Sequence, residues 1–343
     1  MMQRNHGERT ESMNQSAIGI LLLILAGAMN GSFTLPMKFT KKWAWENTWH
    51  VWTIFALCVF PSVLTVLTVP SLGRVYSDAG SGPIAIAAGC GAGWGVSQVF
   101  FGLAVDAIGI ALAFSVILGI SAAVGALIPL FTTGLAFTSQ GIAVMGGVAL
   151  VIVGVLVCAK AGRAREAALG KGPAGKPSVA KGLLFCTFIG LGSALVGLGL
   201  QYGGRLADVA KAAGASETWK NNAIWLPLML AGALPNFTYC IYLMVKNKTG
   251  SRLGASGTGG YWFLAAIMAV CWFGSTVMYG VSKNILGTVV AWPAYMSLIV
   301  ITAMVLGVVT GEWKGSGRKP LQVMFAGLVV LVLSIVVLSL ATS

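Results

Sequence analysis

Residues 94–114 read WGVSQVFFGLAVDAIGIALAF, and residues 272–292 repeat the pattern of this stretch as WFGSTVMYGVSKNILGTVVAW. In both copies the opening tryptophan is followed by an aromatic-glycine pair at offsets seven and eight, a glycine at fifteen and an alanine-aromatic pair at nineteen and twenty. The copies lie 178 positions apart, far more than the roughly 20–50 residues of a solenoid repeat. Each copy joins two long apolar runs through a short polar link. The sequence therefore predicts an internal repeat that divides one membrane body into two halves.

A weaker match between the halves supports this repeat. It pairs three residues of the first apolar run with three of the run that opens the second half: Gly19 with Gly182, Gly27 with Gly190, and Asn30 with Ser193. Glycines four positions apart let membrane helices approach closely. The first and third runs contain three such pairs: Gly27/Gly31, Gly89/Gly93 and Gly91/Gly95.

Composition places the chain in a lipid bilayer. Hydrophobic residues make up 57% of its 343 positions and charged residues 9%, whereas about a quarter of a soluble domain is charged. Runs of about 20 apolar residues match the thickness of the hydrocarbon layer, where a helix satisfies its own backbone hydrogen bonds. We therefore predict an all-α membrane protein. Its ten transmembrane helices are expected at residues 17–36, 49–69, 83–104, 108–131, 140–160, 181–204, 222–245, 260–281, 287–310 and 320–340.

Five spans per half is an odd number, so the second half must enter the membrane upside down relative to the first. The prediction is thus two inverted five-helix repeats, an architecture that secondary transporters use for alternating access. The chain divides accordingly into four segments: a disordered polar tail (1–16), the first repeat (17–160), a cytoplasmic linker (161–180) and the second repeat (181–343).

The distribution of positive charge predicts the orientation. Links after the first, fifth, seventh and ninth spans carry 15 Lys and Arg residues, against 7 on the opposite side. By the positive-inside rule the richer side is cytoplasmic, which puts both termini on the outer side of the membrane. Four tryptophans at the cytoplasmic start of the second span are then expected to form an interfacial belt: Trp43, Trp45, Trp49 and Trp52.

The remaining composition argues against catalysis and against several kinds of partner. The net charge of +13 sits in the links, so it indicates attraction to lipid head groups rather than to nucleic acid. The six cysteines fall inside apolar runs without paired spacing, and the two histidines, His6 and His50, form no cluster. Every carboxylate lies in the tail, in a link or at a span end. We therefore expect neither metal nor cofactor, and no enzyme activity.

The spans instead contain aromatic rings and neutral polar groups. Aromatic faces against C–H surfaces, with amides facing hydroxyls, suit a neutral sugar. The alternative is that the same amides tie helices together and the aromatics fill the core. The candidate substrate-binding residues are Asn30, Trp94, Gln98, Phe101, Trp272, Ser275, Tyr279, Trp292 and Tyr295.

Helical spacing groups several of these candidates on two faces. Trp94, Gln98 and Phe101 are four and three residues apart, on one face of the third span. Ser275 and Tyr279 follow Trp272 at offsets of three and seven in the eighth span, again on one face. Two such faces, one in each half, predict a central pocket between the halves.

Three motifs resemble those of a known family: Lys41-Lys42-Trp43-Ala44-Trp45-Glu46, the stretch from Gly93-Trp94-Gly95 to Gly109, and Gly311-Glu312-Trp313-Lys314 followed by Gly317-Arg318-Lys319-Pro320. Together they resemble the L-rhamnose/proton symporter family of the drug/metabolite transporter superfamily, over residues 17–340. The resemblance implies ten helices in two inverted repeats and sugar uptake driven by the proton gradient. If protons are coupled, Asp106, Glu46 and Glu312 are the candidates by elimination, although a capping or interfacial role suits a carboxylate at a span end.

The resulting prediction is a proton-coupled importer of a small neutral sugar, most simply L-rhamnose or a related monosaccharide. Its partners are the sugar, protons and the lipid bilayer. Three alternatives stay open at this stage: an exporter of another metabolite, a non-transporting membrane sensor or scaffold, and a membrane enzyme. The sequence does not specify an oligomeric state.

Overall fold

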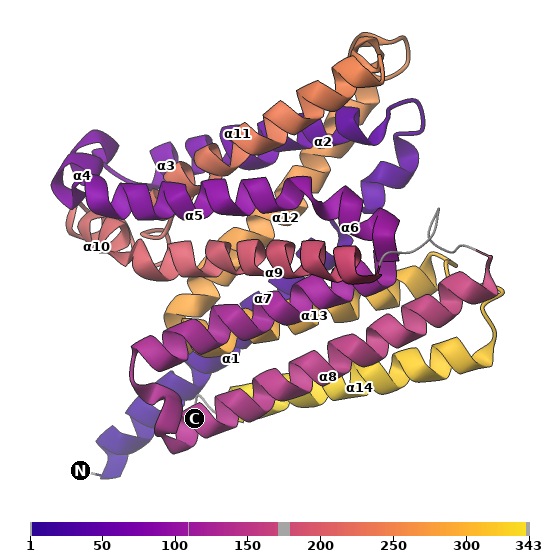
Figure 1. The fold of residues 1–343 in the computed structure, drawn as a ribbon. Helices are drawn as coiled ribbons and strands as arrows, with labels where there is room; N and C mark the ends of the chain where they lie inside the picture. Colours follow the sequence, from indigo (N-terminus) through magenta and orange to yellow (C-terminus); the bar gives the residue numbers. More distant parts are fainter. Residues whose placement is uncertain (1, 109, 171–178, 341–343) are drawn as a thin grey trace.

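The computed structural model describes residues 2–108, 110–170 and 179–340, and within these ranges the chain forms helices and no strands (Figure 1). Eight of the described helical segments are long and apolar enough to cross a membrane, so the prediction of a multi-pass helical protein is confirmed.

The first half contains α1 (Met2–Ser32), η1 (Leu35–Phe39), α2 (Trp45–Thr53), η2 (Ile54–Val59), α3 (Phe60–Thr68), α4 (Leu72–Ala79), α5 (Ser81–Val99), α6 (Phe101–Ile108), α7 (Ile110–Thr132), η3 (Leu135–Phe137) and α8 (Ser139–Ala168). The second half contains α9 (Val179–Tyr202), α10 (Gly204–Ala212), α11 (Asn222–Lys246), η4 (Gly250–Gly254), α12 (Gly259–Leu286), α13 (Thr288–Val309) and α14 (Arg318–Leu340).

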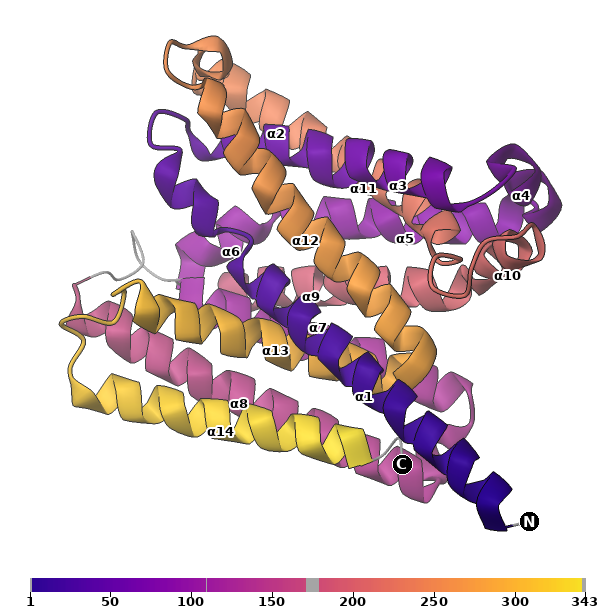
Figure 2. The same ribbon diagram turned by 180° about the vertical axis from the view of Figure 1, so that it is seen from behind.

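The long helices are arranged in layers, each with one helix from either half of the chain (Figures 1 and 2). From one side of the bundle to the other, the layers are α2–α3 with α11, α5 with α12, α9 with α1, α7 with α13, and α8 with α14. Between layers, α11 packs on α5 as α2 packs on α12, and α5 packs on α9 as α12 packs on α1. Likewise α9 packs on α7 as α1 packs on α13. The packing pattern is therefore unchanged when the two halves exchange places.

Glycines that the sequence matches between the halves make matched contacts. Gly19 lies against Leu286, and its counterpart Gly182 lies against Ile108. Gly27 lies against Leu298, and its counterpart Gly190 lies against Ile120. Leu286 and Ile108 are 178 positions apart, as are Leu298 and Ile120, which is the separation of the two copies of the long repeat. The long repeat and the weaker glycine match thus describe one set of helix contacts.

Two predicted spans are irregular in the structure. The span expected at 83–104 is interrupted, because α5 ends at Val99 and α6 starts at Phe101. The span that begins as α2 passes through a π-helical turn, η2, before α3. Pro61 at the start of α3 explains this turn, since its ring lacks an N–H and clashes with the preceding turn of a regular α-helix.

The structure also lengthens two helices. α1 starts at Met2, across residues that the sequence predicts to be a disordered tail, and α8 continues to Ala168, beyond the predicted end of its span at 160. The division of the chain into tail, repeats and linker stays a prediction. The centre of the predicted linker, residues 171–178, lies outside the described residues.

The bundle has two distinct ends. The last turns of α1, α8, α11 and α13 lie at the same end of the bundle, and we call this the basic end because of the Lys and Arg residues near them (Figure 1). α4, α10 and both chain termini lie at the opposite end. The two copies of the long repeat place their polar links at different ends: α6 lies near the basic end, and the α12–α13 link lies at the opposite end.

Candidate functional site

Two tryptophans stack at the middle of the bundle. Trp94 of α5 and Trp272 of α12 lie with their ring centroids 5.4 Å apart and their planes within 21°. Trp94 is buried and Trp272 is half-buried. These residues open the two copies of the long repeat, so equivalent positions of the two halves meet face to face.

A second group of candidates forms a buried polar network beside α1. The Asn30 amide donates to the Tyr295 hydroxyl at 2.6 Å and to the Ser275 hydroxyl at 3.1 Å, and these two hydroxyls lie 2.9 Å apart. The Tyr279 ring stacks on Tyr295 with centroids 5.2 Å apart, and it meets the edge of Trp292 at the same distance. The structure therefore brings five of the nine candidates into one cluster that links α1, α12 and α13.

Gln98 makes a similar contact between another pair of helices, α5 and α9. Its amide donates to the Ser193 hydroxyl of α9 at 3.3 Å and to the Ser97 hydroxyl at 3.4 Å. Ser193 is the sequence counterpart of Asn30, and Ser97 is the counterpart of Ser275. An amide-hydroxyl contact thus occurs between α5 and α9 as it does between α1 and α12.

Phe101 lies on a different helix from Trp94 and Gln98. Because the helix is interrupted at Phe100, Phe101 begins α6 and does not continue the face of Trp94 and Gln98. Its ring packs on the separate apolar cluster that includes Ile108 and Ile117. The prediction of one continuous face through Phe101 is therefore wrong.

The site also includes Trp49 and Trp52, which the sequence predicts to lie in an interfacial belt. The Trp52 ring meets Trp272 edge to face at 5.2 Å and is almost fully buried. The Trp49 ring lies 4.5 Å from Trp52, and its indole N–H donates to the Asn236 side chain at 3.1 Å. Trp45, Trp49 and Trp52 recur at offsets of four and three, so helical spacing alone could have shown that they share a face.

The three candidates for proton coupling differ in their surroundings. Glu46 is buried and accepts hydrogen bonds from the Thr249 hydroxyl at 2.7 Å and from the Asn247 amide at 3.1 Å. Both partners are neutral. Asp106 lies on α6, and its side chain is outside the described atoms.

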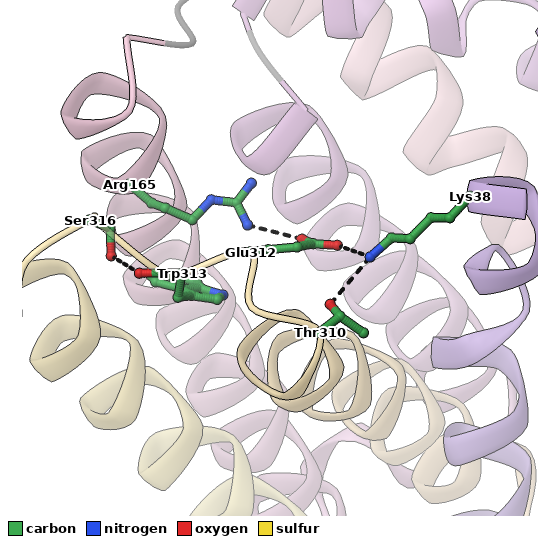
Figure 3. Close-up of polar contacts among 6 residues, drawn as sticks. All are labelled: Lys38, Arg165, Thr310, Glu312, Trp313 and Ser316. Atoms are coloured by element: carbon green, nitrogen blue, oxygen red, sulfur yellow. Dashed lines mark hydrogen bonds and ion pairs between the residues drawn. The ribbon is translucent and has the colours of Figure 1, made fainter. Parts of the chain in front are cut away.

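Glu312 joins three segments at the basic end (Figure 3). Its carboxylate pairs with the Lys38 ammonium at 2.6 Å and with the Arg165 guanidinium at 3.1 Å, while Lys38 also donates to the Thr310 hydroxyl at 3.2 Å. Arg165 lies over the Trp313 ring. Partial burial acts to raise the pKa of the Glu312 carboxyl, but the hydrogen bonds and charges of Lys38 and Arg165 outweigh this effect and lower the pKa.

The Glu312→Gln substitution is expected to lower the melting temperature of the purified protein slightly at neutral pH. Because folding lowers the pKa, the ion pairs stabilise the protein above the ordinary carboxyl value of 4.5, and this contribution is lost as the pH falls through the folded-state pKa. The Glu312 side chain is 40% exposed, so each pair contributes at most about 1 kcal/mol. Thermal unfolding of the parent and Glu312→Gln proteins between pH 7 and pH 3 measures the difference, which should shrink toward the acid end. A difference that grows with acidity would contradict this account.

At the opposite end, hydrogen bonds hold α9, α11, α12 and α13 together. The Lys283 ammonium donates to the Leu200 carbonyl oxygen at 3.1 Å. The Thr288 hydroxyl donates to the Gln201 side chain at 2.6 Å, and the Asn221 amide donates to the Gly280 carbonyl oxygen at 2.9 Å. These hydrogen bonds connect the four helices around Lys283-Asn284, the polar link of the second repeat copy.

The described residues contain no group of three or more His, Cys, Asp or Glu side chains that could hold a metal ion. All six cysteines are free thiols. The site thus offers aromatic faces, amides and hydroxyls, which bind a neutral ligand by stacking and hydrogen bonding.

Comparison with known proteins identifies the relatives of this chain. A family model described as L-rhamnose-proton symport protein matches residues 12–343. Proteins named L-rhamnose-proton symporter from Citrobacter koseri and Cronobacter sakazakii are each 25% identical to it, over 94% and 96% of this chain and 96% and 99% of the relatives, respectively. A protein of the same name from Klebsiella pneumoniae is 25% identical over 92% of this chain and 95% of the relative.

Proposed function

This chain belongs to the L-rhamnose-proton symport protein family, and we propose that it is a secondary transporter that imports L-rhamnose or a related monosaccharide together with protons. The family is one of transporters, so the prediction that the chain is not an enzyme is confirmed. The observation that carries the proposed substrate class is the stack of Trp94 on Trp272, with the Gln98 amide on the helix of Trp94 and the Asn30 amide bonded to Ser275 on the helix of Trp272. Two flat rings and two amides match the C–H face and the hydroxyls of a sugar.

We also propose that the ten predicted helices form two inverted five-helix repeats. The exchange symmetry of the packing supports this, as do the matched contacts of Gly19 and Gly182. Rocking of one repeat against the other would separate the faces of Trp94 and Trp272, which now cover each other, and would offer both rings to a sugar. A stack between matching positions of the two halves is suited to this role, because each half contributes one ring.

The excess of positive charge at the basic end supports a cytoplasmic location for that end, in a bacterial inner membrane with both termini periplasmic. Asp106, Glu46 and Glu312 remain the proposed proton-coupling residues. Of the two whose side chains are described, we propose Glu46 as the first to test. Its hydrogen-bond partners are neutral, whereas protonation of Glu312 would leave two cations without their partner.

Transport of labelled L-rhamnose into proteoliposomes tests the function. With an inward proton gradient, the purified protein is expected to accumulate the sugar above its external concentration, and a protonophore should abolish this accumulation. In Glu46→Gln, accumulation should be lost while exchange of labelled for unlabelled L-rhamnose persists, since exchange needs binding and rocking without net proton movement.

Other results would point to the alternatives. Uptake that is independent of the gradient would contradict symport, and gradient-driven movement only outward would indicate an exporter. Binding of L-rhamnose without flux, in protein that melts like the parent, would indicate a sensor.

A further inference from the structure

We propose that a second, weaker sugar-contact site lies at the basic end, on a continuous row of five indole rings that leads from this surface to the central stack. This inference rests on the proposed function, since it concerns the path of the same sugar. The members of this indole row, from the surface inward, are Trp45, Trp49, Trp52, Trp272 and Trp94.

The spacing of the row is regular. Trp45 stacks on Trp49 with centroids 5.2 Å apart and planes within 19°. Trp52 follows Trp49 at 4.5 Å, and Trp272 follows Trp52 at 5.2 Å. Trp94 completes the row 5.4 Å from Trp272. Each indole therefore contacts the next, and the row is continuous from Trp45 to Trp94.

The second member of the row, Trp49, is directed into the protein and does not act only as an anchor in the lipid interface. The Trp49 indole N–H donates to Asn236, a buried side chain of α11, and the Trp49 ring lies 6.3 Å from Phe33. Trp45, which is 39% exposed, packs its face on Trp49. An interfacial anchor would direct its indole N–H to head groups and its ring to acyl chains.

The middle of the row contains a hydrogen-bond donor without a partner. The indole nitrogen of Trp52 is buried and has no acceptor among the described residues, although the side chain is only 1% exposed. A buried N–H without an acceptor is costly, and a hydroxyl of a passing sugar would satisfy it. The rings supply apolar faces for the C–H surface and methyl group of a deoxy sugar, and Trp52 supplies one donor for a hydroxyl.

Fluorine-19 NMR of protein labelled with fluorotryptophan tests the site directly. The chain has 11 tryptophans, and the resonances of interest are assigned by single substitutions such as Trp45→Phe. On titration with L-rhamnose, the Trp272 resonance should shift first. The Trp45 resonance should shift at a concentration roughly tenfold higher, because an open pair of rings encloses less of the sugar than a central site.

Trp262 is the matched control. It lies near the same end, at the start of α12, and is 37% exposed, but it stands outside the row and its indole N–H donates to the Leu253 carbonyl oxygen. Its resonance should stay unchanged throughout. A shift of Trp272 without one of Trp45, or equal shifts of Trp45 and Trp262, would overturn the second site. If neither Trp272 nor Trp45 responded, the proposed sugar binding itself would fail, so the two failures are distinguishable.

A kinetic comparison provides a second readout. Trp45→Ala should lower the kcat of L-rhamnose uptake about fivefold while the Kd of the solubilised protein changes less than twofold, because release along the row is slowed and the central site is intact. Trp262→Ala should leave both values near those of the parent. Equal losses in the two variants would contradict a role specific to the row.

Discussion

Trp272→Ala is expected to lower kcat/KM for L-rhamnose uptake by roughly 30- to 100-fold, the equivalent of about 2–3 kcal/mol. The substitution removes the ring that stacks on Trp94 and also contacts Trp52, so both the central stack and the indole row lose a member. Initial rates of uptake into proteoliposomes at several sugar concentrations measure the effect. Trp272→Phe, which retains an aromatic face, should recover part of the loss.

Trp219→Ala provides the control for this experiment. Trp219 is 38% exposed and lies between α10 and α11 at the opposite end, away from the stack. Its removal should leave kcat/KM within about twofold of the parent, since exposed substitutions are usually mild. If Trp272→Ala transported as well as Trp219→Ala, with both proteins folded, the stack would not belong to the sugar site.

Gly91→Ala is expected to destabilise the protein by about 1–3 kcal/mol or more and to reduce the amount of folded protein in the membrane. A Cβ at Gly91 would collide with the Leu228 carbonyl oxygen of α11, which is backbone and cannot move aside as a side chain can. One turn further along α5, Gly95 makes the same close approach to Gly232. The added methyl group would therefore force α5 and α11 apart along a shared face. Thermal unfolding in detergent measures the loss.

Gly89→Ala is the matched control in the same helix. A Cβ at Gly89 would meet nothing within 4 Å, so the substitution should be neutral or slightly stabilising, because alanine is the better helix former. The sequence shows both glycines in equivalent four-residue pairs and cannot separate them. Similar melting temperatures for the two variants would show that α5 and α11 do not approach as closely as described.

How well the sequence predicts which candidate residues lie together depends on how local each contact is. Ser275 and Tyr279 share a face of one helix, and the structure retains that spacing. Helical spacing predicts that the face of Trp94 and Gln98 continues to Phe101, but the helix is interrupted at Phe100. Nothing in the local sequence pattern marks this interruption. Hydropathy is unchanged across this point, so a break in an apolar run is invisible to periodicity.

Other parts of the site required the fold. Trp49 and Trp52 follow basic residues at the start of a span, a context typical of interfacial tryptophans, and only their contacts with Asn236 and Trp272 place them inside. Likewise Glu312 was identified as a carboxylate at a span end, but its two cations come from segments about 150 and 270 residues away. No sequence spacing predicts such partners.

The sequence by itself determined the membrane class and the family and predicted the internal repeat, because hydropathy and residue offsets are properties of short stretches and survive without knowledge of packing. It also indicated which glycines and amides of the two halves correspond. Only the tertiary structure decided that Trp94 covers Trp272 and that three further tryptophans extend this stack to the basic end. The physical reason is that contacts between helices depend on where their axes cross. That position is set jointly by all the side chains at the interface, including close approaches such as Gly91 to Leu228.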